Sequence, residues 1–326
     1  MSKTNLIDMH CDTILNAVIP NKRGGYSKLR ENSGHVDIKK LKKVGASAQM
    51  FAVFTPAESL EKFGFKGTPY DFYKGTYKKL IEEIEENSDD IAVARNYEEY
   101  KKNMEENKIS AFLTIEEGCI LDGKIERVQE AYDLGFRFLG LIWKPENCNG
   151  FSNSKDPKLM AMGLKPFGFE VVERMNDLGM IIDVSHLSDG GFYDVARHSK
   201  SPFVATHSNC RALANETRNI TDEMIRILAD KGGVMGLNLM PSFIHVSAKS
   251  KIEYMVEHIK HIKNVGGIET AAIGADFDGM GGDLEIDNVG DMDKLFIALS
   301  KSGFSEDEIE KVAYKNVLRV IKDVVG

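Results

Sequence analysis

Short apolar runs of strand length alternate with longer amphipathic runs along the whole chain. The apolar runs predict strands near residues 5–10, 47–54, 110–115, 137–142, 180–185, 202–206, 233–238 and 271–275. Several of them, including MIID, GGVMGL and AAIGA, show no polar alternation, which is typical of parallel strands that are covered on both faces. The pattern therefore predicts a parallel sheet of eight strands.

The segments between the predicted strands have helical periodicity, as in YKKLIEEIEE, PFGFEVVERMNDLG, DEMIRILADKGG and IEYMVEHIKHIKNVGG. Several end in glycine, which suits the left-handed position that follows a helix. Strand–helix alternation repeated eight times predicts a (β/α)8 TIM barrel. No repeat or linker divides the chain, so residues 1–326 are expected to form a single domain, with an additional C-terminal helix over 305–323.

A doubly wound open sheet is the rival architecture. It is disfavoured because no GxGxxG follows an early strand. In addition, polar side chains that follow so many different strands would not meet at the one switch point of an open sheet. A barrel, in contrast, gathers the carboxyl ends of all its strands at one mouth.

Histidines and carboxylates recur at the ends of the predicted strands, where a barrel would bring them together. His10 and Asp12 end the first run, and their spacing of two places both side chains on the same side of an extended segment. An isolated HxD pair can equally be a hydrogen-bonded strand end. At the end of the first strand of a barrel, however, the pair can reach a single metal ion.

Three further candidates follow other strands. Glu116 ends an apolar strand, where an unpaired carboxylate is unfavourable unless it meets a cation. The next residue, Glu117, would face the other way, so we expect only Glu116 to enter the site. His186 and His207 each close an apolar strand and are 21 residues apart, about one βα unit, which predicts adjacent strands.

The run TAAIGADFDG places two carboxylates after the last strand. Asp276 is positioned to contact a metal and to accept a proton from a bound water, the task of a general base. Asp278 is expected to fix the loop or to support the metal ligands. Three histidines and three carboxylates exceed the needs of a closed tetrahedral zinc site and match a two-metal site bridged by a carboxylate.

Composition excludes several other classes of protein. The 326 residues carry a formal net charge of −8, and no basic stripe suggests nucleic-acid binding. No secretory signal or membrane-spanning run is evident, which predicts a cytoplasmic protein without membrane attachment. The four cysteines lack CxxC spacing and are expected to be reduced thiols, with Cys11 facing away from His10 and Asp12. The oligomeric state stays open, a homodimer included.

At these motifs the sequence resembles the renal (membrane) dipeptidase family, zinc dipeptidases of the amidohydrolase-like barrel group. The resemblance runs from LIDMHCDT through IEEG, LKPFGFEVVERMNDLGMIIDVSHLSD, THSNCRAL, TRNITDE and GGVMGLN to IGADFDG. It implies two Zn²⁺ ions and hydrolysis of dipeptides by a hydroxide that bridges them, D-residues at the second position included. A dipeptide is then the expected small-molecule partner.

Carried over residue by residue, the resemblance makes His10 and Asp12 ligands of one zinc, Glu116 the bridging ligand, and His186 and His207 ligands of the second zinc. Asp276 becomes a proton shuttle that also contacts the first metal. Arg218 in TRN would bind the C-terminal carboxylate of the substrate, which the forked guanidinium can bind through two hydrogen bonds.

This chain departs from some relatives after the fourth strand, where Trp143 stands in place of a histidine that contacts the reacting carbonyl. Trp143 is therefore expected to form a wall of the substrate pocket.

Another amidohydrolase reaction on the same site, such as deacylation of N-acyl amino acids or opening of a lactam, is the enzymatic alternative to dipeptide hydrolysis. A non-catalytic binding barrel is the remaining one, and the complete ligand set argues against it.

Overall fold

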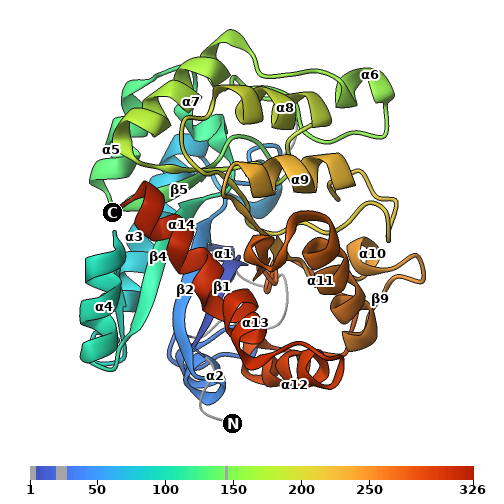
Figure 1. Cartoon of the computed structure of the whole chain (residues 1–326). Coiled ribbons are helices and arrows are strands. Elements are labelled where there is room, and N and C mark those ends of the chain that lie inside the picture. The colour runs from blue at the N-terminus through green and yellow to red at the C-terminus, as the bar shows by residue number, and fades with distance from the viewer. Residues whose placement is uncertain (1–4, 20–27, 144–145) are drawn as a thin grey trace.

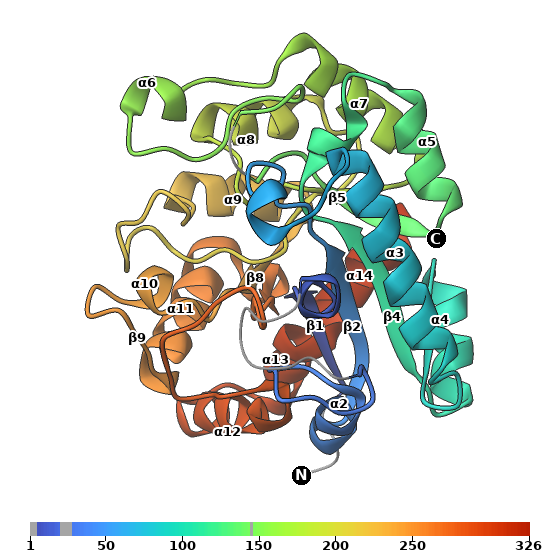
Figure 2. The ribbon, with the colours of Figure 1, turned by 180° about the vertical axis from the view of Figure 1, so that it is seen from behind.

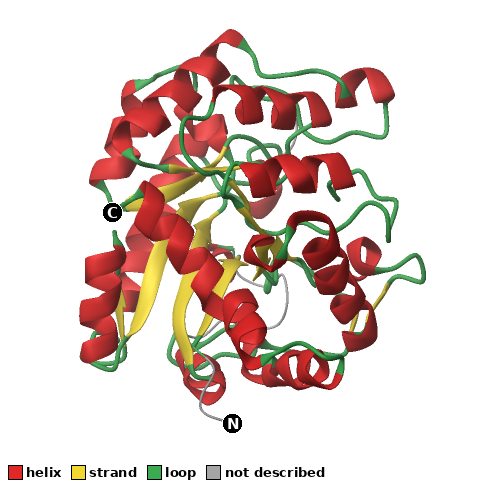
Figure 3. Cartoon of the chain, viewed as in Figure 1, coloured by secondary structure: helices red, strands yellow, loops and turns green. Residues whose placement is uncertain are grey.

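The computed structural model describes residues 5–19, 28–143 and 146–326, and its centre is a closed parallel barrel. Figure 3 shows the strands gathered at the centre with helices around them. The barrel strands are β1 (Leu6–Cys11), β2 (Ala46–Val53), β4 (Ile109–Ile115), β5 (Phe136–Gly140), β6 (Ile181–Asp183), β7 (Val204–Ala205), β8 (Val234–Leu237) and β10 (Ala271–Ile273).

The order of the strands around the barrel is β2-β1-β10-β8-β7-β6-β5-β4, and pairing of β2 with β4 closes the ring. All these pairings are parallel. The eight-stranded (β/α)8 barrel predicted from the sequence is thus confirmed. Closure leaves β2 and β7 four strands apart in either direction, so these two strands lie opposite each other across the barrel.

The helices follow the strands around the outside of the barrel (Figures 1 and 2). They are α1 (Leu15–Val18), α2 (Ile38–Val44), α3 (Pro69–Glu85), α4 (Tyr97–Glu105), α5 (Glu126–Asp133), α6 (Pro157–Met160), α7 (Pro166–Leu178), α8 (Asp189–His198), α9 (Asp222–Asp230), α10 (Pro241–Ile244), α11 (Ile252–Gly266), α12 (Asp293–Lys301), α13 (Glu306–Glu310) and α14 (Asn316–Val324).

Local sequence explains where several helices begin and end. Thr68 and Asp71 form a reciprocal capping box at the start of α3, and the Thr221 side chain accepts a hydrogen bond from a first-turn N–H of α9. Gly45 and Gly179 adopt the left-handed conformation directly after α2 and α7. The left-handed glycine predicted after PFGFEVVERMNDL is therefore present.

The C-terminal helix predicted over 305–323 exists as a continuous helical stretch. It begins with α13, passes through a π-helical turn at Lys311–Lys315 and continues as α14. Figure 1 shows α14 crossing the strands in front of β1 and β2. Its Val317, Val320 and Ile321 belong to the same buried cluster as the barrel side chains. Burial of an aliphatic side chain of this size contributes about 1.5–3 kcal/mol.

This cluster fills the interior of the barrel with at least one side chain from each barrel strand: Ile7, Met9, Ala48, Met50, Phe112, Phe138, Ile181, Val204, Val234 and Ala272. A larger cluster fills the space between the strands and the outer helices. The barrel is consequently a packed core, and its chemistry is confined to the carboxyl ends of the strands.

Three short strands were not predicted. β3 (Ile91–Val93) pairs with the first residues of β4, outside the closed ring. β9 (Lys249–Ser250) and β11 (Asp283–Leu284) form a separate two-stranded pair. Strands of two or three residues are too short to show a periodicity in the sequence.

Candidate active site

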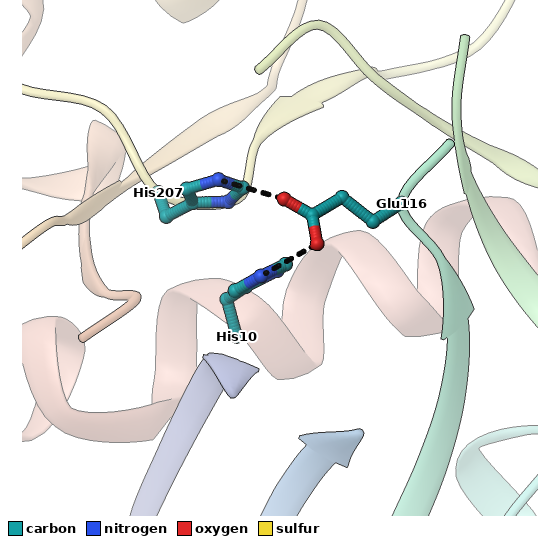
Figure 4. Close-up of side chains that lie close together, drawn as sticks. All are labelled: His10, Glu116 and His207. Atoms are coloured by element: carbon teal, nitrogen blue, oxygen red, sulfur yellow. Dashed lines mark ion pairs between the residues drawn. The ribbon is translucent and has the colours of Figure 1, made fainter. Parts of the chain in front are cut away.

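Six of the predicted site residues converge at the carboxyl ends of the barrel strands. Figure 4 shows three of them, with His10 at the end of β1, Glu116 after β4 and His207 after β7. Two groups have ligand atoms that all lie within 4.8 Å of one another: His10, Glu116 and His207 in one, and His10, Asp12 and Asp276 in the other. His186 also joins them, because its Nε2 lies 3.2 Å from Glu116 Oε1.

Glu116 directs its two oxygens to different histidines. Its Oε2 lies 3.5 Å from His10 Nε2, while its Oε1 faces His186 Nε2 and, at 3.7 Å, His207 Nε2. A carboxylate with one oxygen directed to each side has the arrangement that a bridge between two metal ions requires. Glu117 turns away, as predicted, and accepts hydrogen bonds from Cys119 N, Trp143 N and Asn147 Nδ2.

Two buried polar atoms in the site lack a hydrogen-bond partner among the described residues. They are His10 Nε2 and Asp12 Oδ1, in side chains that are 2% and 6% exposed. Orphaned polar atoms are rare inside proteins because burial without a partner is unfavourable. Imidazole nitrogens and carboxylate oxygens are ligands that zinc takes. The site therefore fits a divalent metal ion.

The electrostatics of the site agree with this fit. Burial, together with the charge of Asp12, raises the pKa of Glu116, and burial raises the pKa of Asp276 to about 6. Burial would lower the pKa of His10, but Glu116 and Asp12 outweigh it, so the pKa of His10 stands well above its usual value. Buried carboxylates this close together repel one another, and a bound cation would relieve that repulsion.

His207 is oriented by a polar chain in the layer beneath it. Its Nδ1 lies 2.8 Å from Thr206 Oγ1, and that hydroxyl donates to Asp183 Oδ2 at 2.5 Å. The Thr206 hydroxyl has one proton, which it donates to Asp183. Its oxygen therefore accepts a hydrogen bond from His207 Nδ1, which carries the proton of the ring. The ring then carries its lone pair on Nε2, which faces Glu116. Neither Asp183 nor Thr206 was singled out from the sequence.

Arg218 lies next to His186, in the loop after β7. Its Nε donates to His186 Nδ1 at 3.1 Å, and its two terminal nitrogens donate to Ser208 Oγ and to His207 O. Its side chain is buried, and the ring of Phe243 lies 6.0 Å from the guanidinium carbon. In this arrangement Arg218 contacts both His186 and His207 and helps to hold them in position.

Asp276 and Asp12 lie on either side of a glycine. A Cβ atom on Gly279 would come within 2.1 Å of Asp12 Oδ2 and 2.4 Å of Asp276 Oδ1, so only glycine fits there. Asp276 Oδ2 also accepts a hydrogen bond from Asn238 Nδ2 at 3.0 Å, and this contact fixes the plane of the carboxyl group.

Asp278 supports the site from outside, as predicted. It accepts hydrogen bonds from Thr13 Oγ1 and from the backbone N–H groups of His35 and Val36. His35 Nδ1 in turn accepts from the Asp278 N–H. These contacts tie the 32–36 segment to the loop after β10.

Three site residues have backbone conformations that L-residues rarely adopt. His186, Asp276 and Asp278 have φ angles of 69°, 63° and 67°. Each such residue costs on the order of 1–3 kcal/mol, and strain of this kind clusters at functional sites. The left-handed conformation turns the chain sharply at the point where the strands end.

The converging groups open into a cavity of about 690 Å³. Asp12, Glu116, His186 and Asp276 form one end, and Trp143 forms part of its wall together with Leu15, Asn16, Phe54, Pro56, Glu58, Ser59, Phe63, Met240, Phe243, Asp278 and Gly279. Trp143 thus lies where the sequence predicted a pocket wall. Cys11 stays outside this cavity lining, and its thiol donates to Met50 O.

Comparison with known proteins decides the family. The sequence profile described as membrane dipeptidase (Peptidase family M19) matches residues 1–325. The chain belongs to this family. Members are metal-dependent hydrolases of dipeptides, so the resemblance noted from the motifs is confirmed and the chain is a metallo-dipeptidase by family.

Individual relatives are more distant. An uncharacterized protein in the pqqA 5′ region of Klebsiella pneumoniae is 35% identical over 230 residues, 67% of this chain and 84% of the relative. Dipeptidase tcpJ of Claviceps purpurea (strain 20.1) is 25% identical over 304 residues, 92% of this chain and 71% of the relative.

Solved structures share the fold over the whole length. The dipeptidase AC, a metallo peptidase of family M19, superposes with a TM-score of 0.88 at 24% identity and 100% coverage of both chains. A metallo peptidase from Rhodobacter sphaeroides, liganded with a phosphinate mimic of the dipeptide L-Ala-D-Ala, also gives 0.88, at 23% identity, covering 99% of this chain and 100% of its own. In the part of the present chain that the structure describes, no helix is long and apolar enough to cross a membrane.

Proposed function

We propose that the chain is a two-zinc dipeptidase that cleaves free dipeptides, including those with a D-residue at the second position. The observation that carries this proposal is the placement of Glu116. One of its oxygens faces His10 and the other faces His186 and His207, beside the unpartnered His10 Nε2 and Asp12 Oδ1. A single carboxylate between two ligand sets suits two metal ions better than one.

In this proposal His10, Asp12 and Asp276 would hold one zinc ion, His186 and His207 would hold the other, and Glu116 would be shared by both. When bound, two zinc ions would supply an activated water and polarise the carbonyl group of the substrate. Thr206 keeps His207 in the tautomer that leaves Nε2 free for such an ion.

Asp276 is the proton carrier of the proposal. Burial raises the pKa of its carboxyl group to about 6 in the metal-free site. A carboxylate in this position could accept a proton from an attacking water and later donate it to the leaving amine. The hydrogen bond from Asn238 holds Oδ2, so Oδ1 is the oxygen that remains for the proton.

Arg218 is proposed to recognise the C-terminal carboxylate. Its Nε now donates to His186 Nδ1, which places the proton of a neutral His186 ring on Nε2. Binding of a metal through Nε2 requires the proton on Nδ1 instead, so this contact with Arg218 has to be given up. The released Nε–H then becomes available for a substrate carboxylate beside the metal site.

The proposed tolerance for a D-residue at the second position depends on which groups of the substrate the enzyme recognises. If the terminal carboxylate and the scissile carbonyl fix the substrate, the configuration of the second residue matters less. The R. sphaeroides neighbour, which binds a mimic of L-Ala-D-Ala, supports this part of the proposal.

Metal analysis and a dipeptide panel test the proposal on the same preparation. We expect about two zinc equivalents per chain, loss of activity with a chelator and its recovery with zinc. L,L and L,D dipeptides should be cleaved, and their C-terminal amides should be poor substrates. Amides are a cleaner probe than an Arg218 variant, because Arg218 also braces His186 and His207. An active preparation without metal, or equal rates for N-acyl amino acids, would move the chain to a different reaction.

A further inference from the structure

The barrel topology sets the direction in which a dipeptide lies in the cavity. Arg218 follows β7, and β7 stands opposite β2 in the closed ring, with the candidate metal ligands between them. A dipeptide whose carboxylate reaches Arg218 and whose carbonyl lies at the centre must therefore extend its N-terminal residue toward the loop after β2. This step rests on the proposed function.

The loop after β2 offers an aromatic wall. Phe54 and Phe63 line the cavity, and the ring centroid of Phe54 lies 4.7 Å from that of Trp143. These rings belong to, or pack against, a small apolar cluster of Leu15, Ile19, Phe54, Leu60 and Phe72 that is separate from the barrel core. An apolar surface that faces the cavity from this side can bury the side chain of an N-terminal residue.

The negative charge of the cavity lining favours a substrate with a positively charged N-terminal group. Its described lining contains five carboxylates, from Asp12, Glu58, Glu116, Asp276 and Asp278, and no lysine or arginine. Arg218 lies outside this lining and contacts one lining residue, His186. Three of the carboxylates belong to the proposed metal site, and Asp278 is engaged by Thr13 and by backbone N–H groups. Glu58 remains. It is exposed, lies in the loop after β2, and has no hydrogen bond or ion pair with the described part of the chain.

We infer that the site selects dipeptides with a large apolar, especially aromatic, N-terminal side chain, and that Glu58 pairs with their α-ammonium group. The side chain packs on Phe54, Phe63 and Trp143 at the wall, while the cationic nitrogen meets the one cavity carboxylate on that side that the metal site does not use. The cavity of about 690 Å³ leaves ample room for such a residue.

The first test varies only the N-terminal residue. Gly-Ala, Leu-Ala and Phe-Ala are compared on the zinc-loaded enzyme. Burial of a phenylalanine side chain predicts a kcat/KM for Phe-Ala roughly tenfold to a hundredfold above that for Gly-Ala, with Leu-Ala between them. A flat series, or a preference for glycine, overturns the inference and leaves the dipeptidase standing. Hydrolysis of none of the three by zinc-loaded enzyme refutes the proposed function itself.

The second test assigns the wall. Phe63→Ala should lower the ratio of kcat/KM for Phe-Ala to that for Gly-Ala by about tenfold, because only the larger substrate loses the contact. Phe65→Ala is the matched control, since Phe65 lies in the same loop as Phe63, packs on Phe72 of α3 and does not line the cavity. A ratio that falls equally in both variants, or in neither, contradicts the role of Phe63.

The third test assigns the ammonium contact. Glu58→Gln should lower kcat/KM about tenfold for Phe-Ala but leave 3-phenylpropanoyl-Ala, which lacks the amine, nearly unaffected. Glu61→Gln, in the same loop but outside the cavity lining, is the control and should match the wild type on both compounds. Equal losses on both compounds for Glu58→Gln, or no loss on either, overturn the assignment of Glu58.

Discussion

Replacement of Thr206 by valine tests whether the layer beneath the metal site prepares a ligand. Thr206 Oγ1 lies 2.8 Å from His207 Nδ1 and donates to Asp183 Oδ2. Thr206→Val keeps the shape of the side chain and removes both contacts. The Nδ1 proton of His207 then has no acceptor at this position, so the ring loses the preference for the tautomer with a bare Nε2.

Two magnitudes follow from these contacts. Loss of an outer hydrogen bond to a metal-binding histidine lowers metal affinity by about 10-fold to 100-fold. Asp183 is 5% exposed, so its Oδ2 also loses a donor in a buried position, which destabilises the fold by about 1–3 kcal/mol. The Thr206 N–H still donates to Asp183 Oδ1 in the variant, which keeps the second effect within this range.

The two effects are measured separately. Zinc affinity is determined by competition with a chromophoric chelator, and the free energy of unfolding is determined on metal-free protein by denaturant titration. Thr206→Ser, which keeps the hydroxyl and loses only a methyl group, should retain wild-type zinc affinity. Wild-type zinc affinity in Thr206→Val, or an equal loss in Thr206→Ser, would refute the role of the hydroxyl.

Three further predictions concern other parts of the chain. Asp276→Asn should retain most of the metal but lower kcat by about 100-fold or more, and a variant that loses metal without a separate kinetic defect would make Asp276 only a ligand. Gly279→Ala should lose metal in elemental analysis because its Cβ would displace Asp12 and Asp276, whereas Gly75→Ala, where nothing lies within 4 Å, should be neutral or slightly stabilising. Burial lowers the pKa of His258 from 6.5 to about 4, so an unfolded chain takes up this proton first and stability should fall by about 3 kcal/mol as pH drops from 6.5 to 4. His258→Gln should flatten that fall in denaturant titrations, and an unchanged pH dependence would count against the assignment.

The barrel was predictable because its strands are buried on both faces. Runs such as MIID and GGVMGL must be apolar throughout, and the same requirement makes a histidine or carboxylate at their ends conspicuous. His10, Glu116 and His207 were found in this way. The predicted ends of the strands were less accurate: the run at 202–206 contains only the two-residue β7, Val204–Ala205.

Other residues of the site could not be predicted from the periodicity of apolar and polar positions. Asp183 and Thr206 precede the histidines by only three residues and one, and in the sequence they are indistinguishable from other polar residues near strand ends. Asn238 is likewise an ordinary residue after β8 until its contact with Asp276 is seen. Such partners are defined by contacts between strands, and the sequence of one strand does not contain the register of its neighbour.

Backbone strain at the strand ends helps to place two of the six proposed ligands, because His186 and Asp276 adopt the left-handed conformation. An extended strand would carry the chain past the mouth of the barrel, whereas a left-handed residue turns it sharply and directs the side chain inward. Aspartate tolerates this conformation well, and Asp276 and Asp278 both adopt it. His186 tolerates it less, and its carbonyl is held by Asn153 through both the backbone and the side-chain N–H groups. The loop after β5 thereby keeps a metal-site histidine in a conformation that it would not adopt alone, and it couples the wall of the substrate cavity to the ligand set.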